Sequence, residues 1–267
     1  MCLVLFAHQA DPRYALVLAA NRDEFHARPA APAAWIEPDV LAGRDLQAGG
    51  TWLALRRDGR FALVTNVRGP GASRPGAPSR GALPLQVVHD HRDLFQLLPE
   101  LAAGLPAHSG CNLLAGSPGS LHCLSTHRPG QTRVAAGVHG LSNHALDTPW
   151  PKVARGTAGL RAWLTEDGED PEALFILLGD RSRAADAQLP TTGVPLEWER
   201  RLSAAFIVAP DYGTRCSTVL LISRTGQVRL VERSFGPEGQ ATAERAFSFE
   251  LVPPDRRKSM DERDRAH

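Results

Sequence analysis

The strongest constraint on the fold of this chain is that its apolar runs of strand length follow one another in hairpins. The runs CLVLFAH from residue 2 and YALVLAANRD from residue 14 flank the turn signal Asp11-Pro12. A second pair of runs, TWLALRR and RFALVTNV, flanks Asp58-Gly59, a dipeptide typical of tight hairpin turns. Strands joined by short turns pair antiparallel, so this order predicts antiparallel sheets instead of a doubly wound parallel fold.

The remaining segments predict an α+β fold in which helices cover these sheets. Ala and Pro residues predict an irregular surface loop over 26–39, and Gly and Pro residues predict a long loop over 68–82. Helical spacing of apolar residues predicts a helix over 83–103, and Pro151 and Pro171 mark the starts of helices over 150–165 and 171–180. Further strands are expected at CNLLAGS, SLHCLSTH, VAAGVHGLSN, SAAFIVA, CSTVLLIS, QVRLVERSF and AFSFELV. We expect a single domain over 1–252 and a charged, disordered tail over 253–267.

Composition excludes several classes of protein. The formal net charge is +1, so the chain lacks the basic excess of a dedicated nucleic-acid binder. It has neither a signal peptide pattern nor the roughly 18 apolar residues of a membrane span, which favours a cytoplasmic protein. Its four cysteines form no C-x-x-C pair, which argues against a zinc or redox motif and predicts no metal site. The oligomeric state is not indicated.

Cys2 is the most reactive candidate group. Removal of Met1 would place its thiol beside a free α-amine, which is basic enough near neutral pH to accept the thiol proton. The first hairpin pairs the start of one strand with the end of the next, so Asn21 and Asp23, which share a strand face, are expected near Cys2. The Asp23 carboxylate would hold the terminal ammonium, and Arg22 could hold that carboxylate. The alternative is that Cys2 is a small apolar residue that opens a buried strand.

The motifs of the whole chain resemble one family. The segments CLVLFA, LAANRDEF, GGTWLAL, VTN, GLSNHALDTPWPK and YGTRCSTVLLI occur in order between residue 2 and about residue 251 together with a later ERSF. They are similar to the NRDE family, also called the transport-and-Golgi-organisation protein 2 family. That family is assigned to the N-terminal-nucleophile hydrolase superfamily, so the resemblance implies a four-layer αββα sandwich of two mainly antiparallel sheets.

The resemblance to the penicillin V acylase and bile salt hydrolase branch implies roles for single residues. Cys2 matches the nucleophile, and Asp23 matches the aspartate that binds the new N-terminus. Asn66 resembles an oxyanion-hole asparagine, Asn143 resembles an asparagine near the nucleophile, and Arg215 falls where the branch has a late active-site arginine. The branch also has an arginine three residues before the aspartate, but this chain has alanine there and carries its arginine at position 22.

Each carried-over residue also has a purely structural interpretation. Asn66 ends a predicted strand and suits a turn, Asn143 precedes a helix and suits a cap, and Arg215 is one of 28 arginines. Trp52 would line an apolar pocket or pack in the core. His144 lies near the predicted site, although a lone histidine is more often a satisfied surface or core residue.

Two functions follow from the resemblance. One is hydrolysis of a non-peptide amide bond, with a small-molecule substrate and no required cofactor. The alternative is a non-catalytic carrier that uses the same pocket, because family members are implicated in haem trafficking and lipid homeostasis. Haem is then a candidate ligand, although the chain has no C-x-x-C-H attachment motif.

Overall fold

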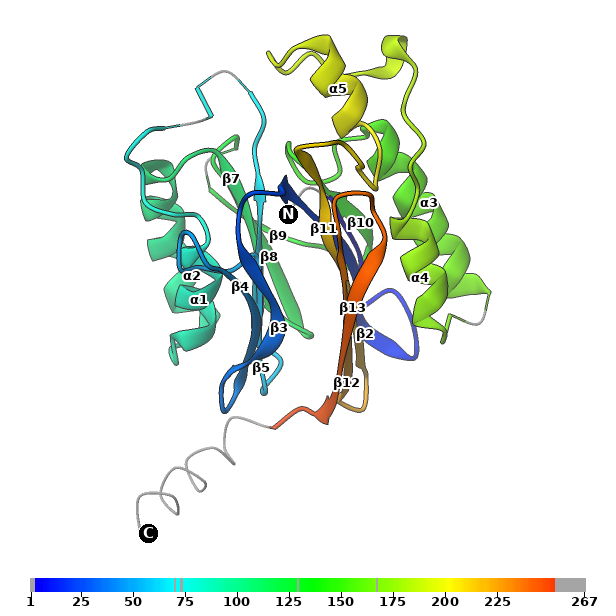
Figure 1. Cartoon of the computed structure of the whole chain (residues 1–267). Helices are drawn as coiled ribbons and strands as arrows, with labels where there is room; N and C mark the ends of the chain where they lie inside the picture. The colour runs from blue at the N-terminus through cyan, green and yellow to red at the C-terminus, as the bar shows by residue number, and fades with distance from the viewer. Residues whose placement is uncertain (1–2, 70, 73, 129, 167, 253–267) are drawn as a thin grey trace.

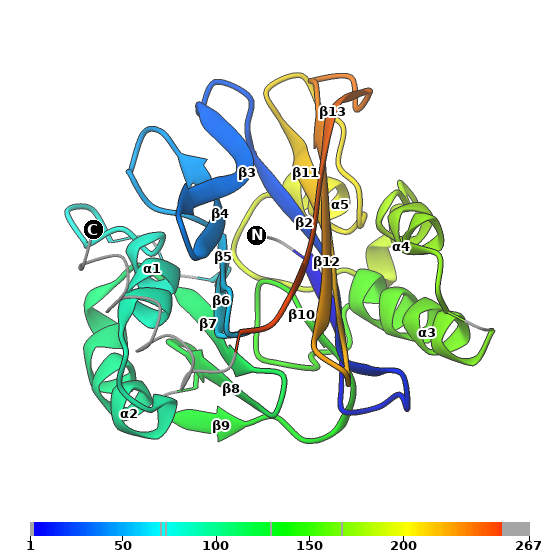
Figure 2. The ribbon, with the colours of Figure 1, turned by 90° about the horizontal axis from the view of Figure 1, so that it is seen from below.

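The computed structural model describes residues 3–69, 71–72, 74–128, 130–166 and 168–252. Two antiparallel sheets lie face to face, and helices cover the outer face of each sheet (Figures 1 and 2). The predicted α+β class and the αββα sandwich are confirmed. The predicted tail over 253–267 lies outside the described residues.

The first sheet contains both ends of the described chain. Its strand order is β10 (Gly137–Leu141), β1 (Leu3–His8), β2 (Tyr14–Phe25), β11 (Tyr212–Ser223), β12 (Gln227–Phe235) and β13 (Ala241–Glu250). The predicted first hairpin is confirmed, with Leu3 opposite Asn21 and His8 opposite Leu16. β11, from the last quarter of the chain, lies between β2 and β12.

The second sheet is built from consecutive strands. They are β3 (Ala30–Glu37), β4 (Val40–Asp45), β5 (Leu53–Arg56), β6 (Phe61–Asn66), β7 (Cys111–Ser117), β8 (Ser120–Ser125) and β9 (Gln131–Arg133). The hairpin predicted around Asp58-Gly59 joins β5 to β6, and Gly59 has the positive φ of 88° that such a turn requires. The short strand β9 was not predicted.

Helices form the two outer layers. α1 (Ala82–His89) and α2 (Leu94–Gly104) cover the second sheet, whereas α3 (Pro151–Thr165) and α4 (Pro171–Leu178) cover the first (Figure 1). The single helix predicted over 83–103 is wrong, because helix α1 ends at His89 and the Asp93 side chain caps a new helix by accepting from Phe95 N. A further short helix, α5 (Leu196–Leu202), was not predicted. Among the described residues, no helix combines the length and apolar character needed to cross a membrane.

Side-chain alternation along the strands creates separate apolar layers. In β1, Val4 and Phe6 pack in the cluster between the sheets, while Leu3, Leu5 and Ala7 pack against α3 and α4. A third cluster joins the second sheet to α1 and α2. β1 is therefore buried on both faces, which explains its continuous apolar run.

Two predicted segments differ in the structure. The irregular loop expected over 26–39 is mostly strand β3, an edge strand whose register shifts between Ala31 and Ala34 accommodate Pro32. Conversely, the strand expected at SAAFIVA is absent from the described sheets, because β11 occupies the place beside β2. The backbone of this segment bonds side chains, since Ala205 O accepts from Asn21 and Ile207 N donates to Thr214 Oγ1. It also forms an isolated bridge between Val208 and Gly213 of β11.

Candidate functional site

Three segments meet where β1 begins. Leu3 pairs with Asn21 of β2, and on its other side the next residue, Val4, pairs with Leu141 of β10. The start of β1 therefore lies between the end of β2, which carries Asp23, and the segment after β10, which carries Asn143. Cys2 lies outside the described residues.

Asp23 is held in place by a bond from the neighbouring strand. The carboxylate is buried, and its Oδ1 accepts a hydrogen bond of 2.6 Å from Thr214 Oγ1 of β11. The same hydroxyl oxygen accepts from Ile207 N at 2.9 Å. This chain of bonds fixes the orientation of the carboxylate at the end of β2. Thr214 was not predicted as part of the site.

Asn21 has a structural role at the same strand end. Its Nδ2 donates to the carbonyl oxygens of Leu178 and Ala205 at 2.9 and 2.8 Å, and its Oδ1 accepts from Ser217 Oγ at 2.6 Å. The side chain is fully buried. These bonds leave the amide little capacity for a ligand, so Asn21 positions the end of β2 against α4.

Asn66 and Asn143 join the two sheets. Asn66 ends β6 of the second sheet, and its carbonyl oxygen accepts from Asn143 Nδ2 at 3.0 Å. Arg68 completes this junction: its Nη2 donates to Asn143 Oδ1 at 3.2 Å, and its Nη1 forms an ion pair of 2.6 Å with Glu199 of α5. Glu199 also accepts from Thr192 N at 3.0 Å. The two predicted asparagines are therefore brought together, whereas Arg68 and Glu199 were not predicted.

Two adjoining hollows lie beside this junction. They measure about 380 and 300 Å³ and share Val67, Arg68, Gly69 and Ala72; we call them together the Arg68 cavity. Asn66 and Asn143 line the smaller hollow, and His144 lines the larger one.

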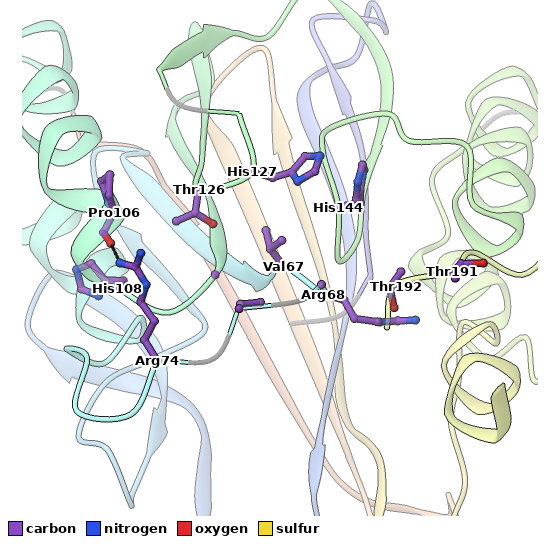
Figure 3. A pocket seen from close by; sticks show the side chains of 14 residues that line it. Val67, Arg68, Arg74, Pro106, His108, Thr126, His127, His144, Thr191 and Thr192 are labelled. Carbon is purple, nitrogen blue, oxygen red and sulfur yellow. Dashed lines mark hydrogen bonds between the residues drawn. The ribbon is translucent and has the colours of Figure 1, made fainter. Parts of the chain in front are cut away.

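His144 forms an imidazole pair in the Arg68 cavity. Its ring centre lies 4.0 Å from that of His127, and its Nδ1 is 2.9 Å from Thr148 Oγ1. Figure 3 shows the two imidazole rings next to each other. Burial and the neighbouring His127 lower the pKa of His144. The neutral ring is thus the favoured form near neutral pH.

Arg22 and Trp52 lie together on the face of β2 that is turned toward the second sheet, opposite to the face that carries Asn21. The Arg22 side chain faces the space between the sheets, with its guanidinium carbon 4.5 Å from the Trp52 ring centre. Its Nη2 is 3.6 Å from Asp45 Oδ2, so Arg22 pairs with Asp45 instead of the predicted Asp23. Neighbouring residues of a strand point to opposite faces, which explains this difference. A cavity of about 300 Å³, which we call the Arg22 cavity, borders both side chains.

Arg215 lies at a bulge in β11 and also borders the Arg22 cavity. Its Nη1 donates to the carbonyl oxygens of Phe25, His26 and Arg28, at 3.0, 3.2 and 3.1 Å. Burial lowers the pKa of Arg215. The guanidinium thus holds the turn that follows β2.

The described cysteines are poor nucleophiles. Cys111, Cys123 and Cys216 are buried free thiols. Burial raises the thiol pKa to about 11 at Cys111 and about 12 at Cys123, and well above its ordinary value at Cys216. No group of three or more metal-ligating side chains occurs among the residues that the structure describes.

Comparisons with known proteins give a family match and a fold match. Residues 1–237 match the family profile described as Transport and Golgi organisation 2. The bovine transport and Golgi organization protein 2 homolog is 34% identical over 261 residues, which cover 88% of this chain and 93% of that protein. The human homolog is 30% identical over 259 residues, with the same coverage. The structure is similar to a mutant conjugated bile acid hydrolase from Clostridium perfringens, with a TM-score of 0.51 over 94% of this chain and 92% of that one. Sequence identity there is 9%, so the likeness concerns the fold alone.

Proposed function

This chain belongs to the transport and Golgi organisation 2 family, and we propose that it hydrolyses a non-peptide amide bond with Cys2 as the nucleophile. The observation that supports the proposal is that Asp23 on β2 and Asn143 after β10 lie on the two sides of the start of β1, with Asn143 bonded to Asn66. The fold likeness to a hydrolase whose studied form is a cysteine-to-alanine mutant supports it.

In the first proposed step, the α-amine of Cys2 takes the thiol proton, and the thiolate attacks the carbonyl carbon of the amide. Asp23 would stabilise the resulting ammonium. As the C–N bond breaks, the ammonium gives this proton to the leaving nitrogen, and a thioester remains. Water then attacks the thioester, the amine accepts the water proton, and the C–S bond breaks to restore the thiol and release an acid.

The oxyanion of each step needs hydrogen-bond donors that are already in position. The side-chain amide of Asn66 borders the Arg68 cavity and makes no hydrogen bond to another described residue. Asn143 Nδ2 donates a hydrogen bond of 3.0 Å to the backbone carbonyl oxygen of Asn66, and Arg68 Nη2 donates to Asn143 Oδ1. We therefore assign Asn66 the oxyanion role and Asn143 and Arg68 the role of positioning residues.

The test compares Cys2→Ala with Cys111→Ala on a panel of fluorogenic acyl-aminomethylcoumarin amides. Cys2→Ala should lower kcat by roughly 10³-fold or more, since a nucleophile is lost. Cys111→Ala also removes one thiol, but from the cluster under α1, and should keep full activity. Intact mass should show that active protein lacks Met1. Unchanged turnover by Cys2→Ala, or retained Met1 in active protein, would refute the mechanism.

The second candidate function is a non-catalytic small-molecule carrier, favoured by the imidazole pair in the Arg68 cavity. Haem binding would need a free imidazole nitrogen, and His144 offers Nε2 because Nδ1 contacts Thr148. The ring centres of His127 and His144 are only 4.0 Å apart, which is too close for ligation of one iron from opposite sides. One axial histidine is therefore the arrangement to test.

Titration with haem separates this carrier from the hydrolase. A carrier should give a saturable Soret shift at about one equivalent, lost in His144→Ala and kept in Cys2→Ala. His89→Ala serves as the control. The half-exposed His89 ring lies on α1, where it pairs with Glu37 of β3, and it does not line the cavity. Haem binding that is equal in His144→Ala and wild type would exclude this site.

A further inference from the structure

The Arg22 cavity borders a buried cation with one donor nitrogen that lacks a hydrogen-bond partner among the described residues. Arg22 is only 4% exposed, and its Nη1 has no hydrogen-bond partner among the described residues. The guanidinium stacks on the Trp52 ring, and its Nη2 forms an ion pair of 3.6 Å with Asp45 Oδ2. Buried donors without partners are rare in folded proteins, because each has given up its hydrogen bonds to water without a replacement.

The lining of this cavity carries more cationic than anionic side chains, with Arg22 and Arg215 against Glu232. Asp45 is shared, because Arg28 Nε lies 2.7 Å from the same oxygen that Arg22 approaches. Arg215 adds a second guanidinium to the cavity wall. Both carboxyl oxygens of Glu232, which also borders the cavity, already accept hydrogen bonds from Ala33 N and Thr218 Oγ1, and burial raises the pKa of this carboxyl group.

The walls of the cavity define the size and polarity of a ligand. The volume is about 300 Å³, and Ala30, Ala31, Pro32 and Trp52 give the lining an apolar part. A planar guanidinium fork matches a carboxylate, which accepts two parallel hydrogen bonds. The site thus offers a cation beside a small apolar surface.

We infer that the Arg22 cavity is a binding site for the carboxylate of a small aliphatic acid. The carboxylate would accept from Arg22 Nη1 and lie over the Trp52 edge of the cavity, and the aliphatic part would contact the alanines of β3. This inference does not require the hydrolysis proposed above, since it concerns binding without any bond change.

The experiment is a calorimetric titration of wild-type protein with hexanoate, hexanamide and inorganic phosphate. Hexanoate should bind saturably, and hexanamide, which has the same shape without the charge, should bind at least tenfold more weakly. Arg22→Gln should weaken hexanoate binding by roughly tenfold or more, as expected for loss of a charged hydrogen bond. Arg22→Lys, which keeps the charge and loses the fork, should be intermediate.

A matched control is available in a second arginine–tryptophan stack. Arg57 lies 4.0 Å from the Trp35 ring centre outside the cavity, so Arg57→Gln should leave hexanoate binding unchanged. If Arg22→Gln does not fold, Ala31→Leu tests the same site by filling it from the half-buried wall, and should also abolish binding. Equal binding of hexanoate by wild type and either variant would overturn the inference. Absence of hexanoate binding by wild type, or tighter binding of phosphate, would also overturn it.

Discussion

At the scale of single residues, the surroundings of Glu232 change its acidity. Its Oε1 accepts from Ala33 N at 2.7 Å, and its Oε2 accepts from Thr218 Oγ1 at 3.2 Å. The residue is 2% exposed, and burial raises its pKa. The carboxyl group thus links β12 to both its neighbour β11 and the opposite sheet.

The raised pKa makes stability depend on pH. The neutral form of Glu232 is favoured more in the folded state than in the unfolded state. The stability that this group contributes is therefore fully present below the ordinary pKa of glutamate. It is lost as pH rises through the folded-state pKa. The free energy of unfolding of wild type relative to Glu232→Gln should therefore fall as the pH rises.

Urea unfolding at a series of pH values from 4 to 8 measures this effect. Glu250→Gln is the control, because Glu250 is an exposed residue of the adjacent strand β13. An identical pH profile for wild type and Glu232→Gln would show that the buried group does not titrate in this range.

At the scale of elements, the contact between α3 and the first sheet depends on small residues. A Cβ atom at Gly156 of α3 would lie 2.6 Å from both terminal carbons of Leu5, which is fully buried in β1. The helix therefore approaches the sheet more closely than any larger residue permits. The start of β1, where the candidate site lies, is supported by this contact.

Gly156→Ala should destabilise the protein by about 1–3 kcal/mol, because the methyl group overfills a packed interface. Gly104→Ala is the matched control at the end of α2, where a Cβ would meet no atom within 4 Å. That variant should be stabilised by roughly 0.5–1 kcal/mol through helix propensity. Thermal or urea unfolding of both variants checks the pair, and equal effects at the two glycines would contradict the packing argument.

Elements with local signals were predictable, and those that depend on distant partners were not. The hairpin around Asp58-Gly59 and the helix starts at Pro151 and Pro171 carry their own sequence signals. β3 does not, since its Ala and Pro residues form a strand only because β4 pairs with them. The segment after α5 shows the opposite case: it is apolar, but β11 takes the place beside β2.

The same distinction applies to the candidate site. Leu3 lies opposite Asn21, as the first hairpin implied, so the approach of Asp23 to the start of β1 followed from local sequence. The ion pair of Arg68 with Glu199 joins residues 131 positions apart, and no local pattern indicates it. Arg22 was predicted at the site, but its partner Asp45 belongs to the other sheet.

At the scale of the whole molecule, the two sheets differ in the sequence positions of their strands. The second sheet uses strands in sequence order from β3 to β9, so it grows by addition of neighbours. The first sheet takes β1 and β2 from the start of the chain and β11, β12 and β13 from its end. The candidate site lies where the first sheet contacts the second, at the bond between Asn143 after β10 and Asn66 of β6.

The place of β11 beside β2 has a consequence for synthesis on the ribosome. β2 ends at Phe25, and its partner strand begins only at Tyr212. At a translation rate of about 5–20 residues per second, this interval takes roughly 10–40 s. Throughout this interval the edge of β2 that faces β11 has no strand to pair with, whereas the second sheet is complete in sequence once β9 ends at Arg133. The nascent chain therefore carries an unpaired strand edge for most of its synthesis, and its protection in that period falls to chaperones or to transient contacts within the chain.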